Sequence, residues 1–288
     1  PANVSGVETI ARAPAAKLAP PAEPHNTAMT DAIAPSLPQR LRRRAAAAFA
    51  AACALLAGCS SNSGCEARYD ASPQFKGCTF QNMDNPDVLP NQSGWKIWTR
   101  FFFETKTDSV PTDAIPVKPL TPAALEALDA QANHVVRLGH SSHLLKLRGK
   151  YWLIDPVFGE RVSPFSFAGP KRFHQPPIAL QDLPPIEGLI LSHDHYDHLD
   201  FPTIKRLASR DTPWGTSLGV GAHLERWGVP SERITELDWW QSLEVAGLEI
   251  TACPCRHFAG RGPSASRATF WSSWAMRGPK HSVWFSGD

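Results

Sequence analysis

The sequence has little net charge, no basic stripe and no apolar run long enough to span a membrane. Its 29 lysines and arginines nearly balance its 27 aspartates and glutamates, which leaves a formal net charge of +2. This charge pattern argues against nucleic acid as a partner. The apolar run at residues 45–56 is shorter than the roughly 20 residues that a transmembrane helix needs. No internal repeat is visible, and a hydrophobic content of 42% suffices for an ordinary core in one large or two small domains.

The apolar run belongs to a segment that is typical of a bacterial lipoprotein signal peptide. Arg40 and the arginines at 42–44 form a basic region before it, and Leu-Ala-Gly-Cys at 56–59 resembles the lipobox. We therefore expect residues 29–59 to be a signal peptide that ends at Cys59, where a lipid is attached. The expected location is the bacterial cell envelope, with the protein anchored by this lipid on the periplasmic side of a membrane. A buried alanine-rich helix is the alternative interpretation.

Composition divides the rest of the chain. Residues 1–28 are rich in alanine and proline and are expected to be disordered or upstream-translated sequence. Residues 60–94 are expected to be a tether, and residues 95–288 the folded domain. Cys65 and Cys78 either pair in an oxidising compartment or stay unpaired.

Apolar and polar residues alternate from residue 134 onward, which predicts a series of β-strands. The predicted strand regions are 134–139, 143–149, 151–157, 187–192, 234–240, 243–254 and 281–288. Helices are predicted from Thr121, from Asp200 to Leu207 and over 223–229, because Thr121 and Asp200 are good caps with a proline in the following turn. Strands that alternate with helices predict an α/β layered domain.

A cluster of histidines and aspartates follows the predicted strand at 187–192. His193, His195, Asp197 and His198 form the pattern His-x-His-x-Asp-His. Neutral imidazoles and carboxylates are the ligands that zinc binds, and two divalent ions held close together can promote hydrolysis. A solvated charged loop is the alternative, but it does not explain a position between a strand and a helix.

This pattern matches the signature of the metallo-β-lactamase superfamily. The flanking stretches that narrow the resemblance are RLGHSSHLLKL, LIDPVFGERVSPFSFAGPKRF, LPPIEGLILSHDHYDHLD, TELDWWQSLEVAGLEITACPCRHF and WFSGD. In order and spacing, residues 134–288 resemble the branch that contains the N-acyl-phosphatidylethanolamine-hydrolysing phospholipases D and their bacterial relatives. Ascorbate-6-phosphate lactonases are more distant relatives. The resemblance implies an α/β fold, the four-layer αββα sandwich with a dinuclear site.

The resemblance also implies a role for each site residue. The implied ligands are His193, His195 and His257 for the first metal, Asp197 and His198 for the second, and Asp288 as a bridge between them. His257 and Asp288 each follow a predicted strand, where loops gather into sites. The family has a further histidine ligand after the bridging aspartate, so the resemblance implies a sandwich that is truncated at its C-terminus.

Two further residues are candidates for contacts with the ligands. His140 aligns with a family position near the site, where it either supports a ligand or packs in the core. Asp194 is expected to point away from the metals, although from there it can still orient a ligand histidine.

The combined observations predict a zinc-dependent hydrolase with two zinc ions. A metal-bound hydroxide would attack the substrate, with Asp197 orienting the water or taking its proton. The resemblance implies a phosphodiester substrate, an N-acyl-phosphatidylethanolamine-like phospholipid that the lipid anchor on Cys59 would bring within reach. A lactonase or another hydrolase of a small phosphorylated ester is the alternative enzyme. A non-catalytic envelope lipoprotein is the alternative of another class.

Overall fold

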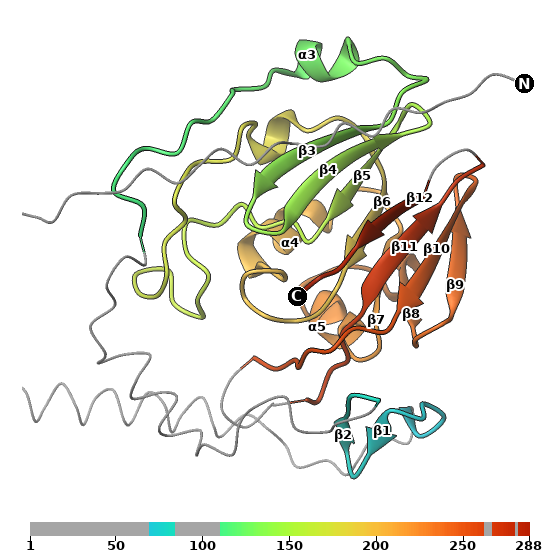
Figure 1. Ribbon diagram of the computed structural model, residues 1–288. Coiled ribbons are helices and arrows are strands. Elements are labelled where there is room, and N and C mark those ends of the chain that lie inside the picture. The colour runs from blue at the N-terminus through green and yellow to red at the C-terminus, as the bar shows by residue number, and fades with distance from the viewer. Residues whose placement is uncertain (1–68, 84–109, 262–266, 280–281) are drawn as a thin grey trace, which may run out of the picture. The chain divides into compact units, whose positions relative to one another are not determined.

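The computed structural model describes residues 69–83, 110–261, 267–279 and 282–288 (Figure 1). The chain divides into two units, 1–58 and 59–288, and every described residue belongs to the second. The expected signal peptide with Cys59, and the segment upstream of it, lie outside the described residues. Within the described part of the chain, no helix combines the length and the apolar character that crossing a bilayer requires.

A six-stranded sheet forms the centre of the domain, in the spatial order β3-β4-β5-β6-β7-β8. Its strands are β3 His134–Gly139, β4 Ser142–Leu147, β5 Lys150–Ile154, β6 Ile186–Leu191, β7 Trp214–Ser217 and β8 Ile234–Leu237. The first three are antiparallel, whereas β5 to β8 run parallel. The predicted strands at 134–157 and 187–192 are therefore confirmed, and β7 was not predicted.

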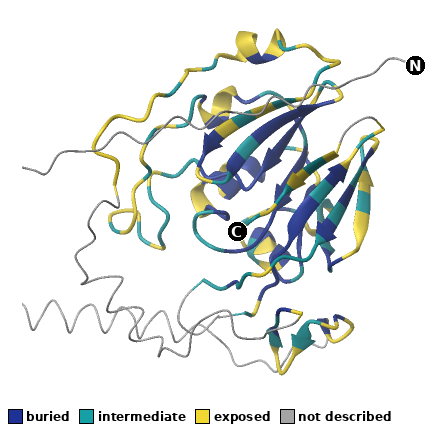
Figure 2. Ribbon diagram, viewed as in Figure 1, coloured by how far each residue is buried: buried dark blue, intermediate teal, exposed yellow. Residues whose placement is uncertain are grey.

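A four-stranded antiparallel sheet faces the first. Its strands are β9 Ser242–Val245, β10 Leu248–Cys253, β11 Ser273–Arg277 and β12 Ser282–Phe285, in the order β12-β11-β10-β9. Trp152 and Ile190 of the larger sheet and Ile250 and Trp274 of the smaller one belong to a single buried cluster. Figure 2 shows the buried residues concentrated in β4, β5 and β6 of the larger sheet and in β11 of the smaller one. A Cβ atom on Gly188 would lie only 2.4 Å from the ring of Trp152, so this glycine leaves room for the indole beside β6.

The helices cover the opposite face of the six-stranded sheet. They are α3 Pro122–Glu126, α4 Phe201–Leu207, α5 Gly221–Arg226 and the short 3-10 turns η2 Leu180–Asp182 and η3 Ser231–Arg233. The Asp200 side chain caps α4 by accepting a hydrogen bond from the Thr203 N–H, and Thr121 caps α3 in the same way. Both predicted caps are therefore confirmed, whereas α5 begins two residues before the predicted helix.

The described elements form three layers, namely helices, the larger sheet and the smaller sheet. No helix among the described residues covers the outer face of the smaller sheet. Trp284 lies on that face with 65% of its surface exposed, because its neighbours Val283 and Phe285 point into the sheet-to-sheet core. The structure thus accounts for three layers of the expected four-layer sandwich.

A small hairpin lies within the segment that was expected to be a tether. It consists of β1 Phe75–Lys76 and β2 Thr79–Phe80, and residues 69–83 around it are folded. Phe80 is fully buried and stacks on Phe270 with 4.6 Å between ring centroids. This part of the chain therefore packs on the domain, in contrast to the expectation.

Cys78 in this hairpin is disulfide-bonded. The described cysteines Cys253 and Cys255 are free, so the partner of Cys78 lies outside the described residues. Pairing with Cys65 remains a prediction.

Candidate metal centre

The histidine-rich turn occupies residues 192–200, between the end of β6 and the start of α4. Because β5, β6 and β7 are parallel, their carboxyl ends meet at one edge of the sheet, where α/β folds place their sites. Backbone hydrogen bonds close the turn, since the N–H groups of His198 and Leu199 both donate to the carbonyl of His195. These two hydrogen bonds make the turn compact.

Three imidazole nitrogens converge in a first donor group. His193 Nε2 lies 2.9 Å from His195 Nδ1, and His257 Nε2 lies 3.2 Å from each of them. Nitrogens that share one zinc ion in tetrahedral geometry, at about 2.0–2.1 Å from it, are about 3.3 Å apart. The ligand atoms of these histidines and Asp288 all lie within 4.8 Å of one another. The donor set and its spacing therefore fit a zinc-sized cation.

Burial keeps these three rings neutral. It is the main cause that lowers the pKa of His193 and of His195, and together with the neighbouring His195 it lowers the pKa of His257 to about 4. A neutral imidazole has one unprotonated nitrogen, which is the form that binds a metal. The first group is thus available as a ligand set at neutral pH.

A second donor group lies beside the first and consists of His140, Asp197 and His198. His140 Nε2 is 3.1 Å from Asp197 Oδ2. Burial favours the neutral form of Asp197, but the hydrogen bond from His140 and the charge of His198 outweigh it and lower the pKa of Asp197 to about 2. His140 has a positive φ of 44° in the tight turn between β3 and β4, a backbone conformation that is uncommon for non-glycine residues.

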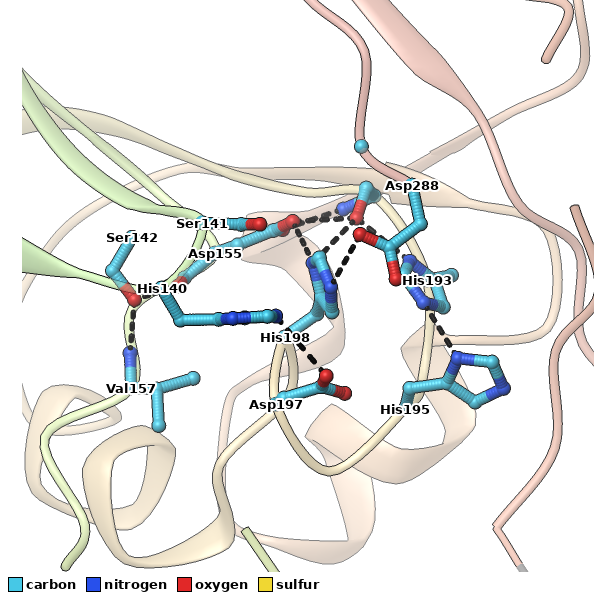
Figure 3. A network of polar contacts seen from close by, with 12 residues as sticks. His140, Ser141, Ser142, Asp155, Val157, His193, His195, Asp197, His198 and Asp288 are labelled. Carbon is cyan, nitrogen blue, oxygen red and sulfur yellow. Dashed lines mark hydrogen bonds and ion pairs between the residues drawn. The ribbon is translucent and has the colours of Figure 1, made fainter. Parts of the chain in front are cut away.

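Asp288 faces both groups. Its Oδ1 lies 3.1 Å from His198 Nε2, and its Oδ2 lies 3.9 Å from His257 Nε2. His198 Nε2 is buried and has no hydrogen bond of ordinary geometry to any described residue, although the carboxylate is so close. A Cβ atom on Gly287 would lie 3.2 Å from the Cβ of Ser192, so glycine allows this terminal segment to approach the turn. Figure 3 shows Asp288 above the two groups.

Asp155 was not predicted as a site residue, yet it supports the centre from the end of β5. Its side chain is fully buried and accepts hydrogen bonds from the Ser192 N–H at 2.7 Å and from His198 Nδ1 at 2.7 Å (Figure 3). Burial opposes a charge on His198, but its contacts with Asp155 and Asp288 raise its pKa to about 10. A metal at Nε2 would replace that proton, while Nδ1 keeps its bond to Asp155, an arrangement that is frequent in metal sites.

Asp194 and Arg261 hold the turn from its other side. Asp194 accepts a hydrogen bond from the Gly260 N–H at 2.6 Å and lies 3.5 Å from His223, so it supports the segment that carries His257 rather than a ligand ring. The Arg261 guanidinium donates to the carbonyls of Asp194 at 2.7 Å and Leu199 at 2.6 Å, and it lies over the ring of Tyr196. Arg261 thereby joins the two ends of the turn.

The structure brings all the predicted ligands together. His193, His195, His257 and Asp288 form the first group, and Asp197 and His198 belong to the second, with His140 beside them. Asp194 is close but contacts no ligand ring among the described residues. Asp155 lay inside the strand predicted at 151–157, whereas β5 ends at Ile154 and Asp155 directly follows it.

A comparison with protein families agrees with this geometry. Residues 151–288 match the family model described as the beta-lactamase superfamily domain. The chain therefore contains a domain of the metallo-β-lactamase superfamily, and the family expected from the sequence is confirmed.

Curated proteins from bacteria and animals are similar to this chain. The chain is 39% identical over 226 residues to uncharacterized proteins of Mycobacterium tuberculosis, covering 76% of this chain and 58% of theirs. It is 34% identical over 237 residues to N-acyl-phosphatidylethanolamine-hydrolyzing phospholipase D 1 of Caenorhabditis elegans, covering 76% of this chain and 65% of that protein. The chain thus spans about two thirds or less of these relatives.

Solved structures also resemble the chain. CmlA, a diiron beta-hydroxylase from Streptomyces venezuelae, is similar with 23% identity and a TM-score of 0.41, over 54% of this chain and 29% of that one. Igni18, a metallo hydrolase from Ignicoccus hospitalis, is similar with 14% identity and a TM-score of 0.40, over 54% and 60%.

Replacing two ligands of the first group should remove a bound metal. We expect the purified protein to retain zinc after dialysis, and the double variant His193→Ala/His195→Ala to lose it, because only one imidazole of the group is left. Elemental analysis measures the zinc content of each protein. His134→Ala is the control, since His134 lies at the start of β3 and belongs to neither donor group. Equal zinc in the double variant would show that the metal binds elsewhere.

Asp155→Asn should weaken the second donor group. An amide cannot accept hydrogen bonds through both of its heavy atoms, so either the Ser192 N–H or the His198 ring loses its partner. We expect metal affinity at the His198 side to fall about 10- to 100-fold, as measured by competition with a chromophoric chelator. Asp211→Asn is the matched control, because Asp211 is 95% exposed. Unchanged affinity in Asp155→Asn would mean that the buried carboxylate does not support the site.

Arg261→Gln should destabilise the turn. The carbonyls of Asp194 and Leu199 would lose a charged donor, and a buried acceptor without a partner costs about 1–3 kcal/mol. We therefore expect the free energy of unfolding, measured by chemical denaturation, to fall by about 2–4 kcal/mol. Arg256→Gln is the control, because Arg256 is exposed and makes no side-chain hydrogen bond within the described residues. A similar loss in both variants would contradict the role of Arg261.

Proposed function

We propose that this protein is a zinc-dependent phosphodiesterase that hydrolyses N-acyl-phosphatidylethanolamine-like phospholipids in the manner of a phospholipase D. The observation that carries the proposal is the pair of donor groups with Asp288 facing both of them. The choice of substrate is supported by the similarity to the phospholipase D of Caenorhabditis elegans.

The ligand atoms of the two donor groups fit two cations, one at each group. The three neutral imidazoles of the first group would hold one ion, and Asp197 and His198, with His140 beside them, would hold the other. When bound, such a pair of ions activates water and neutralises charge that develops on the phosphoryl oxygens. The remaining chemistry, which is the placement of water and the transfer of its proton, falls to the side chains of the centre.

Asp197 is the candidate for orienting that water or taking its proton. The contact with His140 orients its Oδ2 atom, and its low pKa keeps it ionised at neutral pH, so it can accept a hydrogen bond from water. About a third of its side-chain surface is exposed, so water can reach it. Asp155, by contrast, is fully enclosed and can only hold its neighbours in place.

We further propose that the protein is anchored to a bacterial membrane by a lipid on Cys59 and faces the periplasm. The support is the signal sequence at 29–59 with its lipobox-like end. A lipid anchor would keep the enzyme beside phospholipid substrates and would raise their local concentration.

The full chain, loaded with zinc, should cleave N-acyl-phosphatidylethanolamine in detergent micelles and release phosphatidic acid. In isotopically labelled water, the label should enter the phosphate of phosphatidic acid, because water attacks phosphorus and the N-acylethanolamine leaves. Mass spectrometry of the products reads this directly. Asp197→Asn should lower kcat by about 100-fold or more, whereas the exposed Asp211→Asn should leave it unchanged.

The other outcomes separate the alternatives. If the protein instead hydrolyses a lactone or a carboxyl ester, the label will enter the carboxylate of the product. The protein would then be a lactonase or an esterase and not a phosphodiesterase. A chain that binds zinc fully and turns over none of these substrates would favour a non-catalytic lipoprotein.

A further inference from the structure

The β1–β2 hairpin reaches the metal centre through one side chain, that of Asn82. Its Nδ2 donates to the carbonyl of His257 at 2.9 Å, and its Oδ1 accepts from the N–H of His257 at 3.2 Å. The carboxamide thus pairs with the backbone of a candidate ligand that lies 175 residues later in the chain. No other residue in the described part of the chain bonds to either backbone group of His257.

His257 needs such support because it lies in a loop. β10 ends at Cys253, and the segment from Pro254 to Gly260 has no regular secondary structure. The ligand nitrogen of His257 nevertheless lies 3.2 Å from its two partners in the first donor group. A site of this kind needs its groups placed to within about 0.5 Å, and positions on loops are less well defined than positions on strands.

The hairpin is fixed independently of Asn82. Phe80 stacks on Phe270, and its N–H donates to the carbonyl of Arg267 at 2.9 Å. Tyr69 and Phe75 pack against the same aromatic cluster, which also contains Trp239. Removal of the Asn82 carboxamide therefore leaves the hairpin in place. Asn82 is itself only 9% exposed, so water does not readily replace it.

We propose that Asn82 is a positioning residue of the metal centre. By pairing with both backbone groups of His257, it sets the direction in which this imidazole enters the first donor group. The folded segment before the main domain is then a functional part of the site. This inference rests on the proposed function, since it assumes that the first group binds a metal.

The test compares metal binding by the full chain and by three variants. Asn82→Ala removes both hydrogen bonds, and Asn82→Asp keeps the acceptor for the His257 N–H but loses the donor to its carbonyl. Gln81→Ala is the matched control, because Gln81 is the preceding residue, is half-buried and makes no side-chain hydrogen bond within the described residues. Asn82→Asp also preserves side-chain size, so it serves if the alanine variant does not fold.

Two readouts distinguish positioning from a loss of stability. Zinc affinity, measured by chelator competition, should fall about 10- to 100-fold in both Asn82 variants. The visible absorption of the cobalt-substituted protein should shift, because the ligand field at the first group changes when His257 turns. Gln81→Ala should match the wild type in both, and the far-UV circular dichroism of all the proteins should agree.

The failure of this inference is separable from that of the proposed function. A wild-type chain that binds zinc and cobalt, with Asn82→Ala showing the same affinity and the same spectrum, would overturn the role of Asn82 alone. A wild-type chain that binds neither metal would overturn the proposed function and this inference together.

Discussion

The centre depends on holding three neutral imidazole nitrogens toward one another within 3.2 Å. A neutral imidazole can present either of two different nitrogens, so the protein must fix the orientation of each ring. Burial keeps the rings neutral by lowering the pKa values of His193, His195 and His257. Hydrogen bonds then orient the backbone that carries these rings. Arg261 bonds to the histidine-rich turn, and Asn82 bonds to the loop that carries His257. Much of the fold near this edge of the sheet serves that requirement.

The packing of the two sheets provides the rigid base. The strands β5 and β6 end beside each other, which places Asp155 next to Ser192 and so next to the histidine turn. The smaller sheet contributes the other ligands, because His257 follows β10 and Asp288 follows β12. Both sheets are fixed by the buried cluster around Trp152 and Trp274. The core thus sets the distance between ligands that lie far apart in sequence.

The local parts of this site could be predicted from the sequence, whereas its distant supports could not. The spacing of His193, His195, Asp197 and His198 is a local pattern, and the family resemblance supplied His257 and Asp288. Asn82 lies in a polar stretch with no periodicity, and its function depends on a contact across 175 residues. The strands β7 and β11 were missed for a related reason. They are only four and five residues long, with serine or glycine in place of an alternating pattern, and their neighbours in the sheets define them.

The two donor groups differ in how they would hold a cation. The first offers three neutral rings and shares one carboxylate, so its affinity depends mainly on the placement of nitrogens. The second is rich in negative charge, since Asp155, Asp197 and Asp288 all lie close to His198 and raise its pKa. The attraction between a cation and negative charges falls off slowly with distance, whereas coordination by nitrogen lone pairs requires close placement. The second group therefore tolerates small displacements of its side chains better. It follows that positioning is needed most at the first group, where Asn82 bonds to the backbone of His257.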